Sequence, residues 1–219
     1  MPSVVKRFSL LRRNAALSRA AFSLHYRDIH GPLAAAQPGF RKYAYRYDQN
    51  HVESDLLGSG DAPFDGITVT FQVPRPDFRT GFFHHPDYAN VRPDEERLFD
   101  LSRTVSLLGR ETVVRAGEGG AKAIVVCRPA GAVGGNDPNP MFGGEVRAAV
   151  RNDLEVGSAS ALGFGPAPME YGRLWEIWFQ SPEARTDCLK DRAFRKSLSP
   201  DDETAVTVAL AVRDITIFK

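Results

Sequence analysis

The sequence has no apolar run long enough to cross a membrane and no secretion signal. None of its hydrophobic segments approaches the roughly 20 residues that a membrane-spanning helix needs. The start of the chain, residues 1–13, is basic, but charged residues interrupt its apolar stretch, so it lacks the continuous core of a signal peptide. We therefore expect a cytoplasmic protein that does not bind a membrane.

The sequence also lacks an excess of charge of either sign. Lysine and arginine total 28 and aspartate and glutamate total 27, which gives a formal net charge of +1. Proteins that bind nucleic acid usually concentrate positive charge on one surface. The composition therefore gives no support for a nucleic-acid partner.

Cysteine is scarce, and the common cofactor motifs are missing. The chain has two cysteines, Cys127 and Cys188, without a CxxC or Cys/His spacing, so we expect two buried thiols. No GxGxxG and no Gly-x-Ser-x-Gly motif is present, and the glycine-rich segment 131–140 is not followed by Gly-Lys-Ser/Thr. We interpret that segment as a flexible insertion that could act as a lid.

What the sequence does contain is the same order of elements twice. Strand-like alternation and helix signals predict the order βαββαβ in each half, joined by a glycine-rich linker at 117–120. The first half has predicted strands at 4–11, 40–47, 66–73 and 104–114, with helices after Ser18 and near 94–99. The second has predicted strands at 122–127, 158–164, 172–179 and 205–218, with helices at 144–156 and after Ser181.

Such a unit is ferredoxin-like, with two helices on one face of a four-stranded sheet. The other face needs a partner, and two units in one chain can supply it to each other. We therefore predict an α+β protein with two repeats, 3–116 and 120–219, whose sheets close into an intramolecular α/β barrel. The sequence leaves open whether this barrel also forms a homodimer.

Two histidines lie near the predicted end of the first helix. Gly31-Pro32 indicates a helix stop, although residues 33–36 could add a further turn, so His30 is placed where the helix meets the sheet. His30 is either a core or capping histidine bonded to a carbonyl or a general acid/base. His25 lies five residues earlier, about 140° around an α-helix, so the pair does not have metal-chelating spacing and no metal site is expected.

The next strand carries phenols and a further histidine on one predicted face. Tyr43, Tyr45, Tyr47 and His51 have the same parity, so they would point to the same side of the sheet. A phenol there could hold a carbonyl or enolate oxygen of a ring substrate, or the tyrosines could be ordinary sheet aromatics.

Other polar side chains have a plainer interpretation. Three arginines, Arg7, Arg41 and Arg46, could bind a carboxylate, although arginine is more often a surface residue. The adjacent His84 and His85 lie in a proline-flanked loop and are expected to be exposed to solvent.

At these residues the chain resembles the EthD domain family of the dimeric α/β-barrel superfamily. The resemblance covers most of residues 3–114, and residues 121–218 more weakly. It is carried by the segments 8–13, 25–33, 38–43, 49–52, 65–67, 94–100 and 171–184. Within them His30 matches the family's helix-end histidine, and Asn50-His51-Val52 its motif after the second strand. Tyr26 stands where the family commonly has tryptophan.

The resemblance implies a cofactor-free lyase or isomerase that transfers a proton on a hydroxylated aromatic or lactone ring compound. Taking the resemblance together with the strand and helix patterns, we predict His30, His51 and Tyr43 as catalytic residues and His25, Tyr26 and Tyr45 as substrate-binding residues. The alternative is a non-catalytic small-molecule-binding or pathway-auxiliary protein. A heme-binding barrel is disfavoured, because the histidines follow the EthD pattern.

The second half offers no comparable chemistry. Its predicted helix at 144–156 contains no histidine, and the strand predicted at 158–164 has no titratable side chain. A general acid/base near neutral pH needs such a group. We therefore predict one site, between the helices and the sheet of the first half.

Overall fold

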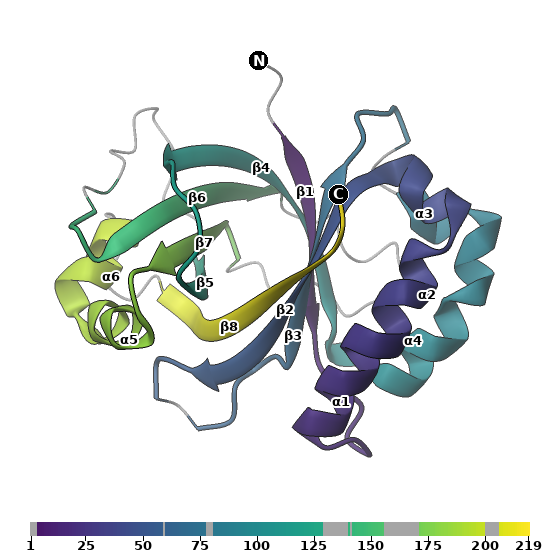
Figure 1. Ribbon diagram of the computed structural model, residues 1–219, viewed down its shortest axis with the longest axis horizontal. Coiled ribbons are helices and arrows are strands. Elements are labelled where there is room, and N and C mark those ends of the chain that lie inside the picture. Colours follow the sequence, from purple (N-terminus) through teal and green to yellow (C-terminus); the bar gives the residue numbers. More distant parts are fainter. Residues whose placement is uncertain are drawn as a thin grey trace.

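The strands form one closed antiparallel barrel (Figure 1). The computed structural model describes residues 4–219 except 59, 78–80, 129–139, 141, 156–170 and 200–205. Within that part of the chain the strands are β1 Val5–Leu11, β2 Ala44–Asp55, β3 Gly66–Gln72, β4 Val105–Arg115, β5 Ala121–Cys127, β6 Val146–Glu155, β7 Arg173–Phe179 and β8 Val206–Phe218. Around the barrel they follow the order β1-β3-β2-β8-β5-β7-β6-β4, which confirms the predicted closure.

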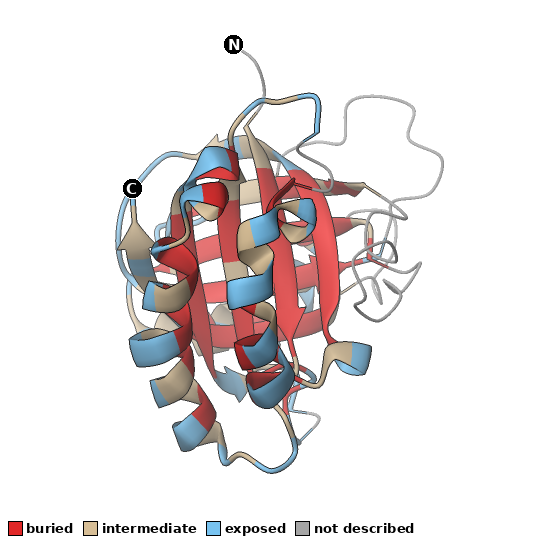
Figure 2. Ribbon diagram, turned by 90° about the vertical axis from the view of Figure 1, so that its right-hand side faces the viewer, coloured by how far each residue is buried: buried red, intermediate tan, exposed pale blue. Residues whose placement is uncertain are grey.

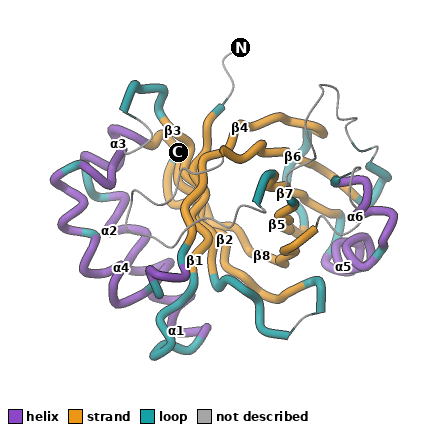
Figure 3. Tube along the Cα trace, turned by 180° about the vertical axis from the view of Figure 1, so that it is seen from behind, coloured by secondary structure: helices purple, strands orange, loops and turns teal. Residues whose placement is uncertain are grey.

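The helices lie outside the barrel in two groups on opposite sides (Figures 1 and 3). The first group contains α1 Arg19–His25, η1 Tyr26–His30, α2 Gly31–Ala35, α3 Pro38–Tyr43 and α4 Arg92–Leu98, with short 3-10 turns η2 Gly81–His84, η3 Pro86–Asn90 and η4 Leu101–Arg103. The second contains α5 Pro182–Lys190 and α6 Arg192–Leu198. No helix in the described residues is long and apolar enough to cross a membrane.

Side-chain alternation along the strands separates the barrel interior from the helix-covered faces. Phe8 and Leu10 of β1 and Ile67 and Val69 of β3 belong to one apolar cluster inside the barrel, together with residues of the second half. Because successive strand residues point to opposite sides, the residues between them face the helices. Figure 2 shows these buried strands behind the helices of the first half.

The two halves have the same strand order, but two complete βαββαβ units are not confirmed. In the same direction around the barrel, the first half runs β4-β1-β3-β2 and the second β8-β5-β7-β6. Within the segment 144–156, predicted as a helix, residues Val146–Glu155 instead form β6, which pairs with β4 and β7. A register shift between Val146 and Ala148 interrupts the period-two alternation, so the sequence there resembles a helix. The strand predicted at 158–164 lies outside the described residues.

Residues 38–43 also differ from the prediction. They form α3, with Pro38 in its first turn, where proline is well tolerated, and Tyr43 as its last residue. The second strand begins only at Ala44, and its register shifts between Ala44 and Arg46. Tyr43, Tyr45 and Tyr47 therefore do not share one strand face, and that prediction was wrong.

The serine caps and one of the thiols match the sequence predictions. Ser18 and Ser181 accept hydrogen bonds from the backbone of Ala21 and Ala184 and so cap the helices that follow them. Cys127 is buried, whereas Cys188 is only partly buried, and both are free thiols.

Candidate functional site

His30 lies inside a continuous helical segment, not at its end. The segment runs from Arg19 to Ala35 and widens into a π-turn at Tyr26–His30, where the amide of Gly31 bonds to the carbonyl of Tyr26. Pro32 has no amide hydrogen for the carbonyl four residues earlier, so the local sequence reads as a stop. The helix accommodates the proline by widening and continues for another turn, which corrects the predicted end at Gly31-Pro32.

The π-turn brings His25 and His30 onto one carboxylate. The Nε2 atom of His25 lies 2.7 Å from Oδ1 of Asp94, and Nδ1 of His30 lies 2.9 Å from Oδ2 of the same residue. In a π-turn the backbone amide bonds to the carbonyl five residues earlier. Residues five apart therefore lie closer together around the helix than the 140° expected for an α-helix. Asp94 comes from α4, and it therefore ties the two helical segments together.

This arrangement orients the imidazole of His30. Burial acts to raise the pKa of Asp94, but the hydrogen bonds from His30 and His25 outweigh it and hold that pKa below its ordinary value. An ionised Asp94 accepts a hydrogen bond from Nδ1–H of His30, and in that tautomer the lone pair lies on Nε2. His30 itself is 5% exposed and packs edge-on against Phe99, with 5.2 Å between the ring centroids.

Glu95 is a second buried carboxyl beside His30. It is 7% exposed and accepts a hydrogen bond from the hydroxyl of Tyr88. Burial raises the pKa of Glu95 above its ordinary value, although the charge of His30 and the Tyr88 hydrogen bond act in the opposite direction. The shift favours the protonated form, so this carboxyl is suited to donate a proton.

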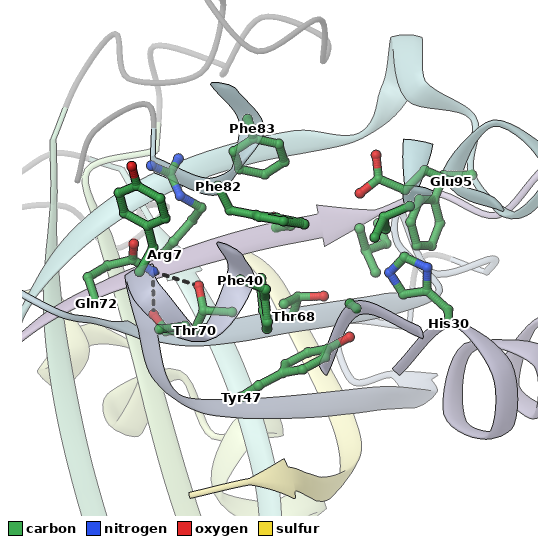
Figure 4. Close-up of a pocket in the computed structure, with 17 residues that line it drawn as sticks. Arg7, His30, Phe40, Tyr47, Thr68, Thr70, Gln72, Phe82, Phe83 and Glu95 are labelled. Carbon is green, nitrogen blue, oxygen red and sulfur yellow. Dashed lines mark hydrogen bonds between the residues drawn. The ribbon is translucent and has the colours of Figure 1, made fainter. Parts of the chain in front are cut away.

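His30 and Glu95 line one end of a cavity between the first group of helices and the sheet (Figure 4); its empty space is about 680 Å³ when the part open to solvent is included. This is the location predicted from the sequence. The cavity is lined by Arg7, Ser9, Leu11, His30, Ala34, Phe40, Tyr43, Ala44, Tyr47, Thr68, Thr70, Gln72, Phe82, Phe83, Val91, Glu95 and Phe99.

The far end of the cavity is polar and carries a cation. Figure 4 shows Arg7, Thr70 and Gln72 at the end opposite His30 and Glu95, with aromatic side chains between them. The amide of Gln72 donates to the hydroxyl of Thr70 at 2.7 Å. Arg7 is 5% exposed, so the expectation that it is a surface arginine was wrong.

His51 lies next to this cavity, in a row of side chains on β2. Its Nδ1 is 2.8 Å from the hydroxyl of Ser23, and its Nε2 is 3.3 Å from Oε1 of Gln49. Gln49 in turn donates to the hydroxyl of Tyr47 at 2.9 Å, and only Tyr47 of this row lines the cavity. Burial lowers the pKa of His51 to about 4, which keeps its imidazole neutral near pH 7.

The other predicted tyrosines are spread over three environments. The ring of Tyr43 lines the cavity while its hydroxyl donates to Asp77 at 2.7 Å. Tyr26 is fully buried beside the cavity, with its hydroxyl 2.6 Å from that of Thr68. Tyr45 is 44% exposed, packs on Phe71 and does not line the cavity.

The adjacent histidines of the loop differ from each other. His84 is exposed, as expected. His85 is partly buried, and its Nδ1 accepts a hydrogen bond from the backbone of Asp87 at 3.3 Å. It packs so closely on Gly39 that a Cβ there would lie 2.2 Å from its ring. Neither histidine lines the cavity.

Sequence reasoning missed the carboxylates and the polar strand residues of the site. Asp94 and Glu95 lie in the acidic segment that carries part of the family resemblance, so that segment was the available signal. Thr68, Thr70 and Gln72 alternate with the apolar Ile67, Val69 and Phe71, which indicates a polar outward face. Among the described residues, no group of three or more histidine, cysteine, aspartate and glutamate side chains could hold a metal ion.

Comparisons with known proteins give a family match within the first half of the chain. Residues 14–102 match the model of the EthD domain. The search of curated proteins gave no match. The "anthrone oxidase-like protein" is similar in structure, with a TM-score of 0.60 and 10% identity over 99% of this chain and 94% of that chain. A "putative monooxygenase from Lactobacillus acidophilus NCFM" gives a TM-score of 0.49 and 7% identity, covering 98% and 95%.

At such low identity the structural likeness concerns the fold. The barrel matches a dimeric α/β-barrel-like fold over nearly the whole chain. The segment that builds the cavity helices, residues 14–102, is similar in sequence to the EthD domain.

Proposed function

We propose that this protein is a small-molecule enzyme that removes a proton from an activated carbon of a hydroxylated aromatic or lactone ring compound, with His30 as the general base. The observation that carries the proposal is the buried Asp94–His30 pair at the end of an otherwise mainly apolar cavity. Such a cavity with a few convergent polar groups is the usual form of a small-molecule site.

The neighbouring groups divide the work of proton transfer. Asp94 holds His30 with Nε2 as its acceptor atom and stabilises the imidazolium that forms. Glu95, whose pKa is raised by burial, gives a proton to the oxygen or carbon on which negative charge develops. Returning the proton at another carbon gives isomerisation, and loss of hydroxide from the neighbouring carbon gives dehydration.

The remaining predicted residues take indirect roles in this proposal. Tyr43 contributes its ring to the cavity wall, since its hydroxyl is bonded to Asp77. His25 acts on His30 through Asp94, while His51 and Tyr26 support the site from outside the cavity lining. Tyr45 is given no role in substrate contact.

A second candidate is oxidation of the same carbanion by dioxygen. It is favoured by the name of the structural relative, an anthrone oxidase-like protein. A ring CH₂ and O₂ would give a ring carbonyl and water, so dioxygen is both the oxidant and the source of the new oxygen atom. The two candidates share proton abstraction by His30 and differ only in the fate of the carbanion.

Turnover by matched histidine variants tests the proposal. A panel of anthrone-like and muconolactone-like compounds would be offered to the wild type, His30→Gln and His84→Gln, since His84 is exposed outside the cavity. We expect kcat/KM to fall about 10²- to 10⁴-fold in His30→Gln, the usual contribution of a general base, and to stay unchanged in His84→Gln. Equal turnover by all three proteins would remove His30 from the mechanism.

The same panel separates the alternatives. Oxygen consumption that matches product formation, and loss of turnover under anaerobic conditions, would identify the oxidation. Oxygen-independent turnover would identify the lyase or isomerase. Saturable binding without any turnover would favour the non-catalytic binding protein.

We further propose that the two halves descend from one ferredoxin-like unit and that the second is degenerate. The strand register supports this: Lys6 lies opposite Phe71 in the pair β1–β3, as Lys122 lies opposite Trp178 in the pair β5–β7. Each lysine also packs over its aromatic partner, at 4.7 and 4.6 Å from the ring centroid.

A further inference from the structure

The cavity contains a buried cation at the end that the proposed proton transfer does not use. Among the described lining residues, Arg7 is the only arginine or lysine. Its side chain comes from the middle of the barrel sheet, where β1 is paired on both sides, by β3 and β4. A side chain on a doubly paired strand has little freedom of its backbone, so the guanidinium is held at one place in the cavity wall.

The described contacts of Arg7 include a hydroxyl and an aromatic ring. Its Nη1 donates to the hydroxyl of Ser106 at 3.2 Å, and its guanidinium lies 5.3 Å from the ring centre of Phe83. Burial lowers the pKa of Arg7 to about 10, so the group still carries its charge at neutral pH. A cation in a weakly polarisable wall attracts an anion more strongly than the same cation in water does.

The rest of the cavity suits a flat ring. Phe40, Phe82 and Phe83 stand between the two polar ends, and Tyr47 adds a ring from the sheet side (Figure 4). Aromatic rings offset or edge-on to one another contribute attraction beyond the burial of apolar area. A ring compound that lies between these side chains would present opposite edges to His30 and to Arg7.

We propose that Arg7 binds an anionic oxygen group, a carboxylate or a phenolate, on the edge of the ring substrate remote from the carbon that His30 deprotonates. The part about His30 rests on the proposed function, whereas the anion site at Arg7 stands on the cavity alone. The planar guanidinium can donate two parallel hydrogen bonds to a carboxylate, which fixes the position of the ring as well as its affinity. Arg7 is thereby a residue that determines specificity.

Equilibrium binding of matched naphthalene derivatives tests the anion site without any turnover. The probes are 2-naphthoate and 2-naphthamide, which have the same shape but differ in charge. We expect the wild type at pH 7 to bind the carboxylate at least tenfold more tightly than the amide. Binding both equally, preferring the amide or binding neither would overturn the proposal.

Substitution then assigns the preference to one side chain. Arg7→Met keeps length and removes the charge, and Arg41→Met does the same at an exposed arginine. We expect Arg7→Met to weaken 2-naphthoate binding about 10- to 100-fold and to leave 2-naphthamide within threefold, while Arg41→Met changes neither. If Arg7→Met fails to fold, the preference of the wild type still decides the question, because it needs no variant.

Two further experiments distinguish a carboxylate from a phenolate ligand, and the anion site from the proposed function. Binding of 2-naphthol that strengthens as pH rises toward the pKa of the phenol, with no such rise for 2-methoxynaphthalene, would identify a phenolate site; otherwise the carboxylate is the ligand. His30→Gln should keep the carboxylate preference while losing turnover. Retained preference with no turnover in any protein would reject the proposed function but not the anion site.

Discussion

The helix-covered faces of the two halves differ in what their strands present to the helices. On β3 the outward residues include Thr68 and Thr70, and these positions face Ser9 and Arg7 of β1. In the corresponding register of the second half, Trp175 and Ile177 of β7 face Val125 and Ala123 of β5. Small polar side chains thus stand in one half where large apolar ones stand in the other.

This difference explains why the cavity lies in the first half. Trp175 and Ile177 are almost completely buried in the cluster beneath α5 and α6, together with Leu189 and Leu198. All the described residues that line the cavity belong to the first half, and the cavity lies beneath α1–α4. A helix-covered face that contains a cavity makes fewer packing contacts than one whose space is filled by side chains. Packing there therefore stabilises the first half less than the second, but it leaves room for a ligand. The comparison leads to four predictions.

The largest loss of stability is expected from a substitution in the apolar cluster beneath α5 and α6. Trp175→Ala should lower the free energy of unfolding by about 3–5 kcal/mol, because it opens a cavity and removes the hydrogen bond from Nε1 to the carbonyl of Leu198 at 3.1 Å. Thr68→Ala, at the corresponding position of the first half, should cost only about 1 kcal/mol for its lost bond to Tyr26. Urea unfolding of both variants measures the difference. Similar losses would show that the two faces are equally packed.

Sequence reasoning predicted the features of this comparison that depend on local pattern. Strand alternation located most of the strands, and serine caps marked two helix starts. The pattern could not reveal that the helices cover Arg7 and leave a cavity beneath it. That depends on the packing of α1–α4 against the sheet, which is a property of the assembled fold.

The errors arose where tertiary structure overrides a local signal. Gly31-Pro32 is a stop in an isolated helix, but here the helix widens and continues, which is why His25 and His30 meet at Asp94. The bulges near Ala44 and Val146 shift the register of their strands, so parity assigned the tyrosines to the wrong face and β6 read as a helix. Such a shift depends on how a strand pairs with its neighbour, and the sequence of the strand itself does not show that pairing.

The interior of the barrel offers a second test of the difference between the halves. Glu176 on β7 stands opposite Ile124 of β5, as Val69 on β3 stands opposite Phe8 of β1. The Glu176 carboxylate accepts hydrogen bonds from Lys6 at 2.6 Å and Lys122 at 3.0 Å. Glu176→Gln leaves two buried ammonium groups without their shared charge and should cost about 3 kcal/mol at pH 7.

The pH dependence of that variant sharpens the test. Burial acts to raise the pKa of Glu176, but the charges of Lys6 and Lys122 outweigh it and hold the pKa far below its ordinary value. The stability that Glu176 contributes is therefore present above its ordinary pKa and is lost as the pH falls toward the lower folded value. Glu176→Gln should lose this acid dependence. Glu111→Gln, whose side chain is more exposed, should change stability less. Equal stability of Glu176→Gln and the wild type at pH 7 would contradict the prediction.

A smaller change in stability is expected from His51, which lies beside the cavity of the first half. Burial lowers its pKa from 6.5 to about 4, so the unfolded chain binds more protons between these values. Stability should therefore rise with pH from 4 to 6.5 because of this residue. His51→Gln should reduce that rise by on the order of 1 kcal/mol. Urea midpoints at pH 4.5 and pH 7 measure it, with the exposed His84→Gln as control. An unchanged slope would show that His51 protonates as readily in the folded protein.

The smallest change in stability is expected from the substitution that makes the first half most like the second. Thr70→Ile introduces the residue found at position 177, in corresponding register. It loses the hydrogen bond from Gln72 but buries additional apolar surface, so the free energy of unfolding should change by less than about 1 kcal/mol. Thr70 lines the cavity near Arg7, and the larger side chain should therefore abolish binding of 2-naphthoate. Calorimetric titration of the folded variant checks this, with Thr186→Ile at a partly exposed position of α5, outside the cavity, as control. Binding of 2-naphthoate by Thr70→Ile would mean that the ligand does not occupy this end of the cavity. The polar residues on the helix-facing side of β3 would then need an explanation other than ligand binding.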